Sequence, residues 1–125
     1  MKNDISNLLK WFTMANEDMG TVFHKYREFD FVLDYVFSGE GPVGDNGYLV
    51  LWKKSVLEKR NDDYMVEHFL DDVFLIGTDG GDYAFGMNKQ KQFVAVPFLG
   101  MCNENVKVLG NTIEELIIKV SNCDY

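Results

Sequence analysis

The sequence predicts one domain of the α+β class that spans residues 1–125. Short apolar runs, each bounded by turn residues, follow one another through the middle of the chain and predict strands. Stripes of apolar residues at helical spacing lie before and after this region, so helices and strands are segregated along the chain. The chain contains 46% hydrophobic residues, enough for a single core, and shows neither a repeat nor a linker that would divide it.

The N-terminal third predicts helices. Four apolar residues near the start recur at the spacing of an amphipathic helix: Ile5, Leu8, Leu9 and Phe12. Asn3 or Asp4 can cap this helix. The segment Phe29–Phe37 fits a helical stripe but also alternates like a strand, and periodicity alone does not decide between the two. We favour a helix there, partly because of the family resemblance described below.

The segment from residue 38 to residue 72 predicts a loop, a strand and a helix. Residues 38–47 are dense in glycine and predict a loop, whose last turn, Asn46-Gly47, begins a strand. Residues 48–52 are a continuous apolar run, as expected of a strand that is buried on both faces. A helix follows over residues 53–61, and residues 67–72 form a polar approach to the next strand.

The most informative stretch is a central hairpin. Two apolar runs, residues 73–76 and 83–85, flank a glycine-rich turn over residues 77–81. Glycine allows the positive φ angles and the close backbone approach that a tight turn needs. We expect Asp79 to bond to backbone N–H groups of this turn, because the spacing of the nearby acids does not match a calcium-binding loop.

The C-terminal third predicts a strand and a helix. Residues 93–99 form a strand in which Pro97 marks an end or an edge, because proline lacks a backbone N–H. Residues 100–110 predict a loop with a short apolar piece. Thr112 and Glu115 form a capping box at the start of the last helix. The inward stripe of this helix consists of Ile113, Leu116, Ile117 and Val120.

The chain is acidic. It carries 20 acidic and 12 basic residues, for a net charge of −8. Such a surface repels phosphate backbones, which argues against a nucleic-acid partner and suits a basic protein partner, although solubility alone also explains it. No apolar run approaches the roughly 18 residues of a membrane span, and no N-terminal signal peptide is recognisable, so we expect a cytoplasmic protein with no membrane contact.

Candidate catalytic and metal-binding residues are few. His24 and His68 are the only histidines, and Cys102 and Cys123 are the only cysteines. Their spacing resembles neither a Cys–His nucleophile pair nor the ligand set of a zinc site, and we expect the two cysteines to be free thiols. We therefore expect no catalytic residue, no metal and no cofactor, and interpret the protein as a binding module rather than an enzyme.

From about residue 35 to residue 120, the chain resembles a SUKH domain of the bacterial Smi/Knr-like type. The resemblance depends on segments that follow one another in the family's order: Ser38–Gly44, Tyr48–Trp52, Lys54–Asn61, Gly77–Gly81, Tyr83–Phe85, Val96–Met101 and Asn111–Leu116. The chain departs from the family in lacking a Leu-Pro-x-x-Tyr motif before Gly39. It also has Asp82 where the family has a third turn glycine, and Met87 where an acidic residue is common.

The resemblance implies a compact domain with a mixed, mostly antiparallel sheet and flanking helices. It also implies a protein-binding module, because bacterial members commonly neutralise a cognate polymorphic toxin, often a nuclease or a deaminase. Such toxins tend to be basic because they bind nucleic acid, and the charge of −8 suits a partner of that kind. The alternative is a non-enzymatic regulatory or scaffold role without a toxin, as the yeast member of the superfamily suggests.

Acidic residues are the candidate contacts with a basic partner: Glu40, Asp45, Asp62, Asp63, Glu67, Asp71, Asp72, Asp79 and Asp82. We expect their effect to be collective, because a single exposed carboxylate is most often a solvated surface charge. Trp11 and Trp52 are interpreted as core residues, with the alternative that Trp52, at a strand end, borders a binding cleft.

Overall fold

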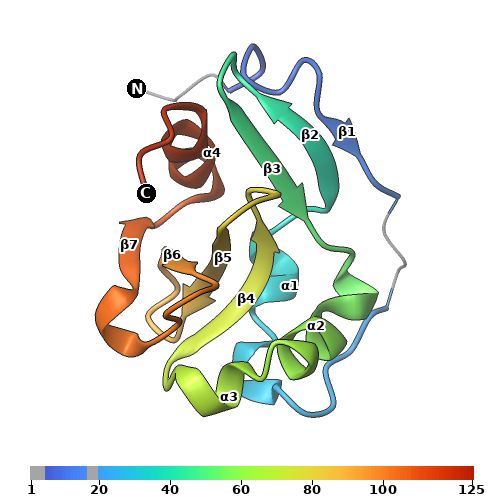
Figure 1. The fold of residues 1–125 in the computed structure, drawn as a ribbon. Helices are drawn as coiled ribbons and strands as arrows, with labels where there is room; N and C mark the ends of the chain where they lie inside the picture. Colours follow the sequence, from blue (N-terminus) through green and yellow to red (C-terminus); the bar gives the residue numbers. More distant parts are fainter. Residues whose placement is uncertain (1–4, 17–19) are drawn as a thin grey trace.

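The computed structural model describes residues 5–16 and 20–125, so the predicted cap residues Asn3 and Asp4 lie outside the described part. Its strands form one sheet in which neighbours in the chain are neighbours in space, and every pair is antiparallel (Figure 1). The strands are β1 (Thr13–Met14), β2 (Gly39–Val43), β3 (Gly47–Leu51), β4 (Val73–Thr78), β5 (Tyr83–Asn88), β6 (Phe93–Pro97) and β7 (Lys107–Gly110). The predicted α+β class with a mostly antiparallel sheet is confirmed.

Short helices flank this sheet. The α-helices of the described residues are α1 (Val32–Tyr35), α2 (Leu57–Asp63), α3 (Val66–Phe69) and α4 (Ile113–Ser121), and the 3₁₀ turns are η1 (Arg27–Phe29), η2 (Lys54–Val56) and η3 (Asn103–Asn105). In Figure 1, α2 and α3 lie beside β4, whereas α4 lies near β3 and β7. None of the described helices combines the length and the apolar character needed to cross a membrane.

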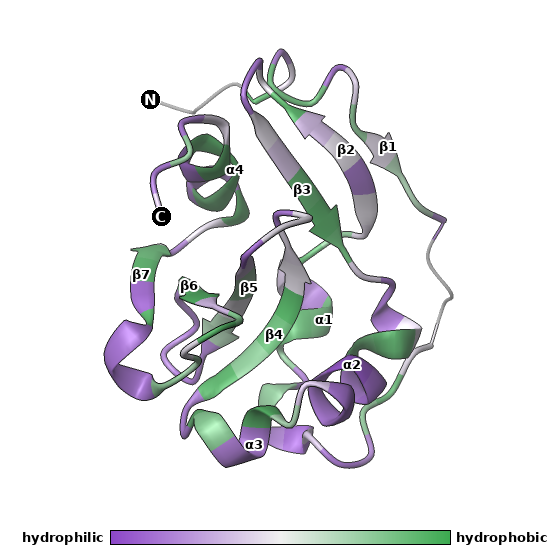
Figure 2. Ribbon diagram, in the orientation of Figure 1, coloured by the Kyte–Doolittle hydropathy of each residue, from purple (hydrophilic) through white to green (hydrophobic). Residues whose placement is uncertain are grey.

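The core is centred on β4 and β5, whose ribbon is largely hydrophobic in Figure 2, whereas α2 is mostly hydrophilic. Phe74 is fully buried, and three aromatic rings from the N-terminal third pack around it: Phe23, Tyr26 and Phe29, with centroids 5.1, 5.2 and 5.5 Å from its own. Burial of such rings contributes about 1.5–3 kcal/mol for each side chain. The N-terminal third is therefore tied to the sheet by aromatic packing.

The structure confirms the predictions that depended on local turn and cap chemistry. β4 and β5 form the central hairpin, and the Asp79 carboxylate accepts hydrogen bonds from the N–H groups of Gly81 and Tyr83. At the start of α4, the Thr112 hydroxyl accepts from the Glu115 N–H at 3.1 Å, and the Glu115 carboxylate accepts from the Thr112 N–H. β6 ends at Pro97, as predicted.

The prediction of a loop over residues 38–47 is wrong, because residues 39–43 form β2. Gly39 and Gly41 allow a neighbouring segment to pack closely against β2. The backbone of residues 11–13 runs close beside this strand, where β1 pairs with it, and a Cβ atom at Gly41 would lie 2.8 Å from the Trp11 carbonyl oxygen. At Gly39 a Cβ atom would meet the Phe12 ring and the Thr13 carbonyl. The remaining residues, 44–46, form the turn to β3.

The predicted N-terminal helix is also wrong, because residues 6–11 form turns closed by short-range bonds such as Phe12 N–H to Leu9 O. The Leu8 carbonyl instead accepts a hydrogen bond from the Gly44 N–H, so a contact with the β2–β3 turn competes with the helix. For residues 29–37, the favoured helix is limited to the single turn of α1, because the chain becomes extended at Val36.

Four further expectations need correction. β3 is buried on one face only, because Tyr48 is exposed and Val50 half-buried on the other. The sequence predicts residues 67–72 as a polar segment leading to the next strand, but residues 67–69 belong to α3. It predicts residues 100–110 as a loop, but residues 107–110 form β7, which pairs with β6. Trp11, expected in the core, is 70% exposed.

Candidate protein-binding face

The junction of α2 and α3 exposes large apolar side chains. α2 ends after Asp63, and Met65 adopts a left-handed conformation with φ of 55° before α3 begins. This sharp turn leaves Tyr64, Met65 and Phe69 with 38 to 50% of their surface exposed. A left-handed conformation is costly for a non-glycine residue, and such positions often occur where a local structure serves a function.

An apolar hollow of about 370 Å³ lies between this junction and the loop after β6. We call it the apolar hollow, and it is lined by Tyr64, Phe69, Phe98, Leu99, Gly100 and Met101. Leu99 is 92% exposed, and the Tyr64 and Phe98 rings pack against each other with centroids 4.9 Å apart. Single exposed apolar residues are common, but a cluster of them on one surface is typical of an interaction site.

A second depression, the aromatic groove, adjoins the hollow. It has a volume of about 790 Å³ and lies on the outer face of β2 and β3, with Trp11, Tyr48 and Trp52 among its lining residues. The alternative interpretation of Trp52 as a cleft residue is therefore supported, although only 8% of Trp52 is exposed. The Trp52 ring stacks on Tyr64 at 5.9 Å, so one aromatic wall separates the groove from the hollow.

The predicted carboxylates of α2 and α3 lie close to the hollow in the chain. Asp63 immediately precedes Tyr64 and forms an i,i+4 ion pair with Lys59. Asp62 accepts hydrogen bonds from the Lys25 ammonium and the Tyr26 hydroxyl, both at 2.7 Å, and these bonds lower the pKa of its carboxyl group. Lys25 also forms an ion pair with Glu67. Asp62 and Glu67 thus help to hold the 25–26 segment against the helices.

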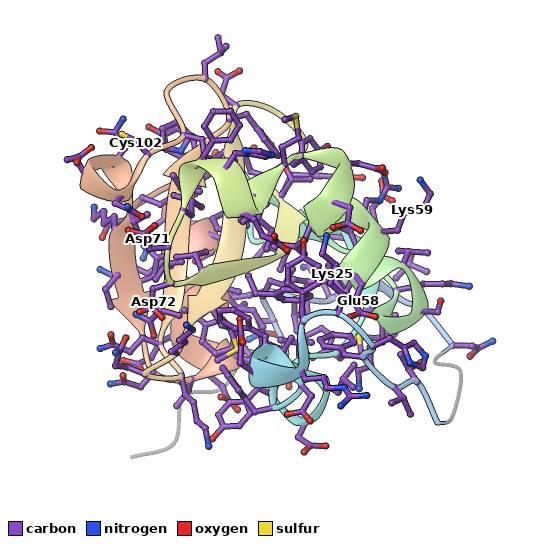
Figure 3. The ribbon with its side chains drawn as sticks, turned by 90° about the horizontal axis from the view of Figure 1, so that it is seen from below. Lys25, Glu58, Lys59, Asp71, Asp72 and Cys102 are labelled. Atoms are coloured by element: carbon purple, nitrogen blue, oxygen red, sulfur yellow. The ribbon has the colours of Figure 1, made fainter. Side chains whose placement is uncertain are left out.

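Glu58 holds the same segment from its other side, and sequence reasoning did not identify it. Its carboxylate accepts hydrogen bonds from the backbone N–H groups of His24, Lys25 and Tyr26, at 2.7 to 3.0 Å. Figure 3 shows Glu58 and Lys25 where α2 faces this segment. Partial burial opposes ionisation, but the three N–H bonds outweigh it and lower the pKa of Glu58.

The other predicted carboxylates are spread around the molecule. Asp71 pairs with the Asn103 amide, and Asp72 accepts from the Lys89 N–H; both follow α3 and lie on the side of Cys102 in Figure 3. Asp79 bonds within the β4–β5 turn and accepts from the Tyr125 hydroxyl at 2.9 Å.

Asp82 and Asp45 make no side-chain hydrogen bond or ion pair within the described residues. The Asp82 carbonyl accepts from the Phe98 N–H, which places this residue beside the hollow. Asp45 lies in the β2–β3 turn. Glu40 lies in the groove and accepts from the Tyr48 hydroxyl at 2.9 Å. The nine carboxylates therefore form no single cluster.

Within the described residues, the histidines and cysteines do not form a catalytic arrangement. His24 and His68 are exposed, Cys102 is half-buried, and both cysteines are free thiols, as predicted. Within residues 5–16 and 20–125, no group of three His, Cys, Asp or Glu side chains lies close enough to hold a metal ion.

The apolar residues of the hollow were missed at the sequence level. A usable signal existed: Tyr64-Met65 interrupts an otherwise polar stretch, and Leu99 follows Pro97 just before Gly100, beyond the end of the strand. Large apolar residues at helix ends and in loops often stay on the surface. They therefore indicate an interaction site more specifically than exposed charged residues, which are common everywhere on a surface.

Comparison with known proteins does not assign the chain. No family model matches it, and no curated protein matches it. The geometry of the described residues defines an α+β domain with an exposed apolar and aromatic surface.

Proposed function

We propose that this protein is a protein-binding module of the immunity type, which binds a basic toxin domain and blocks its action in the cytoplasm. The observation that carries the proposal is the apolar hollow, because Leu99 and Phe69 lose water contact only if another molecule covers them. The hollow combines aromatic and aliphatic side chains on a rigid framework, which is the usual composition of the centre of a protein interface.

The charge of the protein supports a basic partner. The net charge is −8, and Asp63 and Asp82 lie next to residues of the hollow in the chain or through a backbone hydrogen bond. Complementary charge at the rim of an interface speeds association and rejects wrong partners more than it adds affinity. The hollow would thus supply affinity, and the carboxylates would supply association rate and selectivity.

The experiment is co-expression with the polypeptide encoded directly upstream of this gene, followed by a binding measurement with the purified pair. A basic domain whose toxicity is suppressed by this protein is the expected result. The Leu99→Asp variant should weaken binding about tenfold or more, as for an interface centre. Val22→Asp is the matched control, because Val22 is also an exposed apolar residue, at 64%, but lies outside the hollow.

The role of charge is tested by reversing three exposed carboxylates, of which only Asp63 makes an ion pair, a surface one with Lys59. A variant with Asp45→Lys, Asp63→Lys and Asp82→Lys should associate about tenfold more slowly at low salt and show a weaker salt dependence. An unchanged association rate would remove charge from the explanation. Equal binding by Leu99→Asp and Val22→Asp would contradict the assignment of the hollow as the interface.

A regulatory or scaffold role in the same fold is the second candidate. It predicts that the neighbouring genes encode no toxic polypeptide and that Leu99→Asp disrupts binding to some other protein. The co-expression experiment separates the two candidates, because only the immunity role predicts that cells survive the upstream product when this protein is present.

A further inference from the structure

The aromatic groove contains two positive charges, Lys53 and Arg60. Neither forms an ion pair within the described residues, although the protein carries 20 acidic side chains. The lysines that form ion pairs lie outside the groove, as do the other described cations without an ion pair: Lys10, Arg27, Lys54, Lys89 and Lys91. What distinguishes Lys53 and Arg60 is their position in an aromatic groove. Glu40, which accepts a hydrogen bond from the Tyr48 hydroxyl, is the acidic residue of the lining, so the groove has one positive charge in excess on an acidic protein.

Arg60 is held in position by Trp52. Its guanidinium carbon lies 5.6 Å from the centroid of the Trp52 ring, which also stacks on Tyr64. An arginine that packs on an aromatic ring loses little additional freedom on binding, and its planar group suits the two oxygens of a carboxylate. Stacked arginine and tryptophan are also the residue types that contribute most to protein interfaces.

The other walls of the groove are aromatic and apolar. Trp11 is 70% exposed, and Tyr48 is 39% exposed with its hydroxyl donating to Glu40. Val50 and Val56 also line the groove. A ring on the incoming ligand can therefore pack beside Trp11 and Tyr48 while an anion reaches Arg60 and Lys53.

We infer that the aromatic groove binds a carboxylate-bearing segment of the protein partner, with an Asp or Glu side chain at Arg60 and Lys53 and a neighbouring aromatic side chain against Trp11 and Tyr48. This inference rests on the proposed function, since the groove shares its Trp52–Tyr64 wall with the hollow and one partner would cover both. It adds that the partner's contact surface, although basic overall, carries an acidic anchor. That anchor also gives selectivity, because a uniformly basic surface would be repelled at Arg60.

The test uses two peptides that differ only in charge, acetyl-Glu-Tyr-amide and acetyl-Gln-Tyr-amide, and needs no partner protein. Both tryptophans of the chain line the groove, so their two indole N–H signals in a ¹⁵N-labelled sample report binding directly. The charged peptide should shift these signals with about fivefold higher affinity than the neutral one, as for an exposed ion pair. Arg60→Gln and Lys53→Gln should each reduce this difference.

Arg27→Gln is the matched control, because Arg27 is exposed on η1, outside the groove. Equal affinity of the two peptides, or an unchanged difference in both Arg60→Gln and Lys53→Gln, would overturn the inference. So would indole shifts of the same size with inorganic phosphate, since they would assign the groove to a phosphate ligand. A negative peptide result beside intact toxin binding would reject only the groove, whereas the reverse result would reject only the proposed function.

Discussion

Asn61 takes the place of a missing strand partner beside β4, and its removal is the sharpest test of the fold. β3 pairs with β4 only at Gly77 and Thr78, so Leu75 has no strand on that side. The fully buried Asn61 amide fills this position. Its oxygen accepts from the Leu75 N–H at 2.8 Å, and its nitrogen donates to the carbonyls of Leu75 and Leu57, both at 2.9 Å.

The loss of stability can be estimated from the backbone groups that lose their hydrogen-bond partner. Asn61→Ala would leave the N–H and the carbonyl of Leu75 without these partners in a buried site. Each unpaired buried group costs about 1–3 kcal/mol, so the free energy of unfolding should fall by about 2–6 kcal/mol. Because a domain is stable by only about 5–15 kcal/mol, this loss would bring the variant close to unfolding.

The assay is urea denaturation followed by circular dichroism, with the midpoint and the slope measured for each variant. Asn111→Ala is the control, because Asn111 is exposed and its side chain makes no hydrogen bond among the described residues; its effect should stay within about 0.5 kcal/mol. A loss below about 1 kcal/mol for Asn61→Ala at an unchanged slope would refute the reasoning, since it would mean that Leu75 finds other partners at no cost.

Two further predictions concern the helices. Thr112→Ala removes the hydroxyl that accepts from the Glu115 N–H and should lower the free energy of unfolding by about 1 kcal/mol in the same denaturation assay; no loss would contradict the capping box. Glu58→Gln should flatten the pH dependence of stability. The folded-state pKa of Glu58 lies below its ordinary value of 4.5, so its contribution is present above pH 4.5 and is lost as the pH falls through the folded pKa. Urea midpoints between pH 7 and pH 3 measure this, and Glu114→Gln, which removes no side-chain hydrogen bond, should keep the wild-type slope.

The elements predicted correctly are those whose signals are local. The β4–β5 hairpin is specified by its turn residues, and α4 by the capping box and its apolar stripe, and both forms of evidence lie within a few residues of the element. β2 is different, because Gly39 and Gly41 are needed where residues 11–13 run close beside the strand, a contact between segments nearly 30 residues apart. From the sequence alone, a glycine that allows close approach looks the same as a glycine in a loop.

The site was less predictable than the fold, for a physical reason that concerns charge. The sequence does not show whether a carboxylate forms hydrogen bonds within the protein or stays exposed and available to a binding partner. Asp62, Asp71 and Asp79 all turned out to hold loops and segments in place through hydrogen bonds. Reversing them would disturb the fold, and weaker binding by such variants would say nothing about the interface.

Exposed apolar and cationic residues are easier to interpret than carboxylates, because the structure shows whether each has reached the core or a carboxylate. A large apolar side chain belongs in a core, and a lysine or arginine on a protein of charge −8 has many carboxylates available. Leu99 lies outside the core, and Arg60 packs on the Trp52 ring and forms no ion pair within the described residues. Leu99 lies in the hollow on one side of the Trp52–Tyr64 wall, and Arg60 lies in the groove on the other. A single partner could therefore cover Leu99 and supply a carboxylate to Arg60.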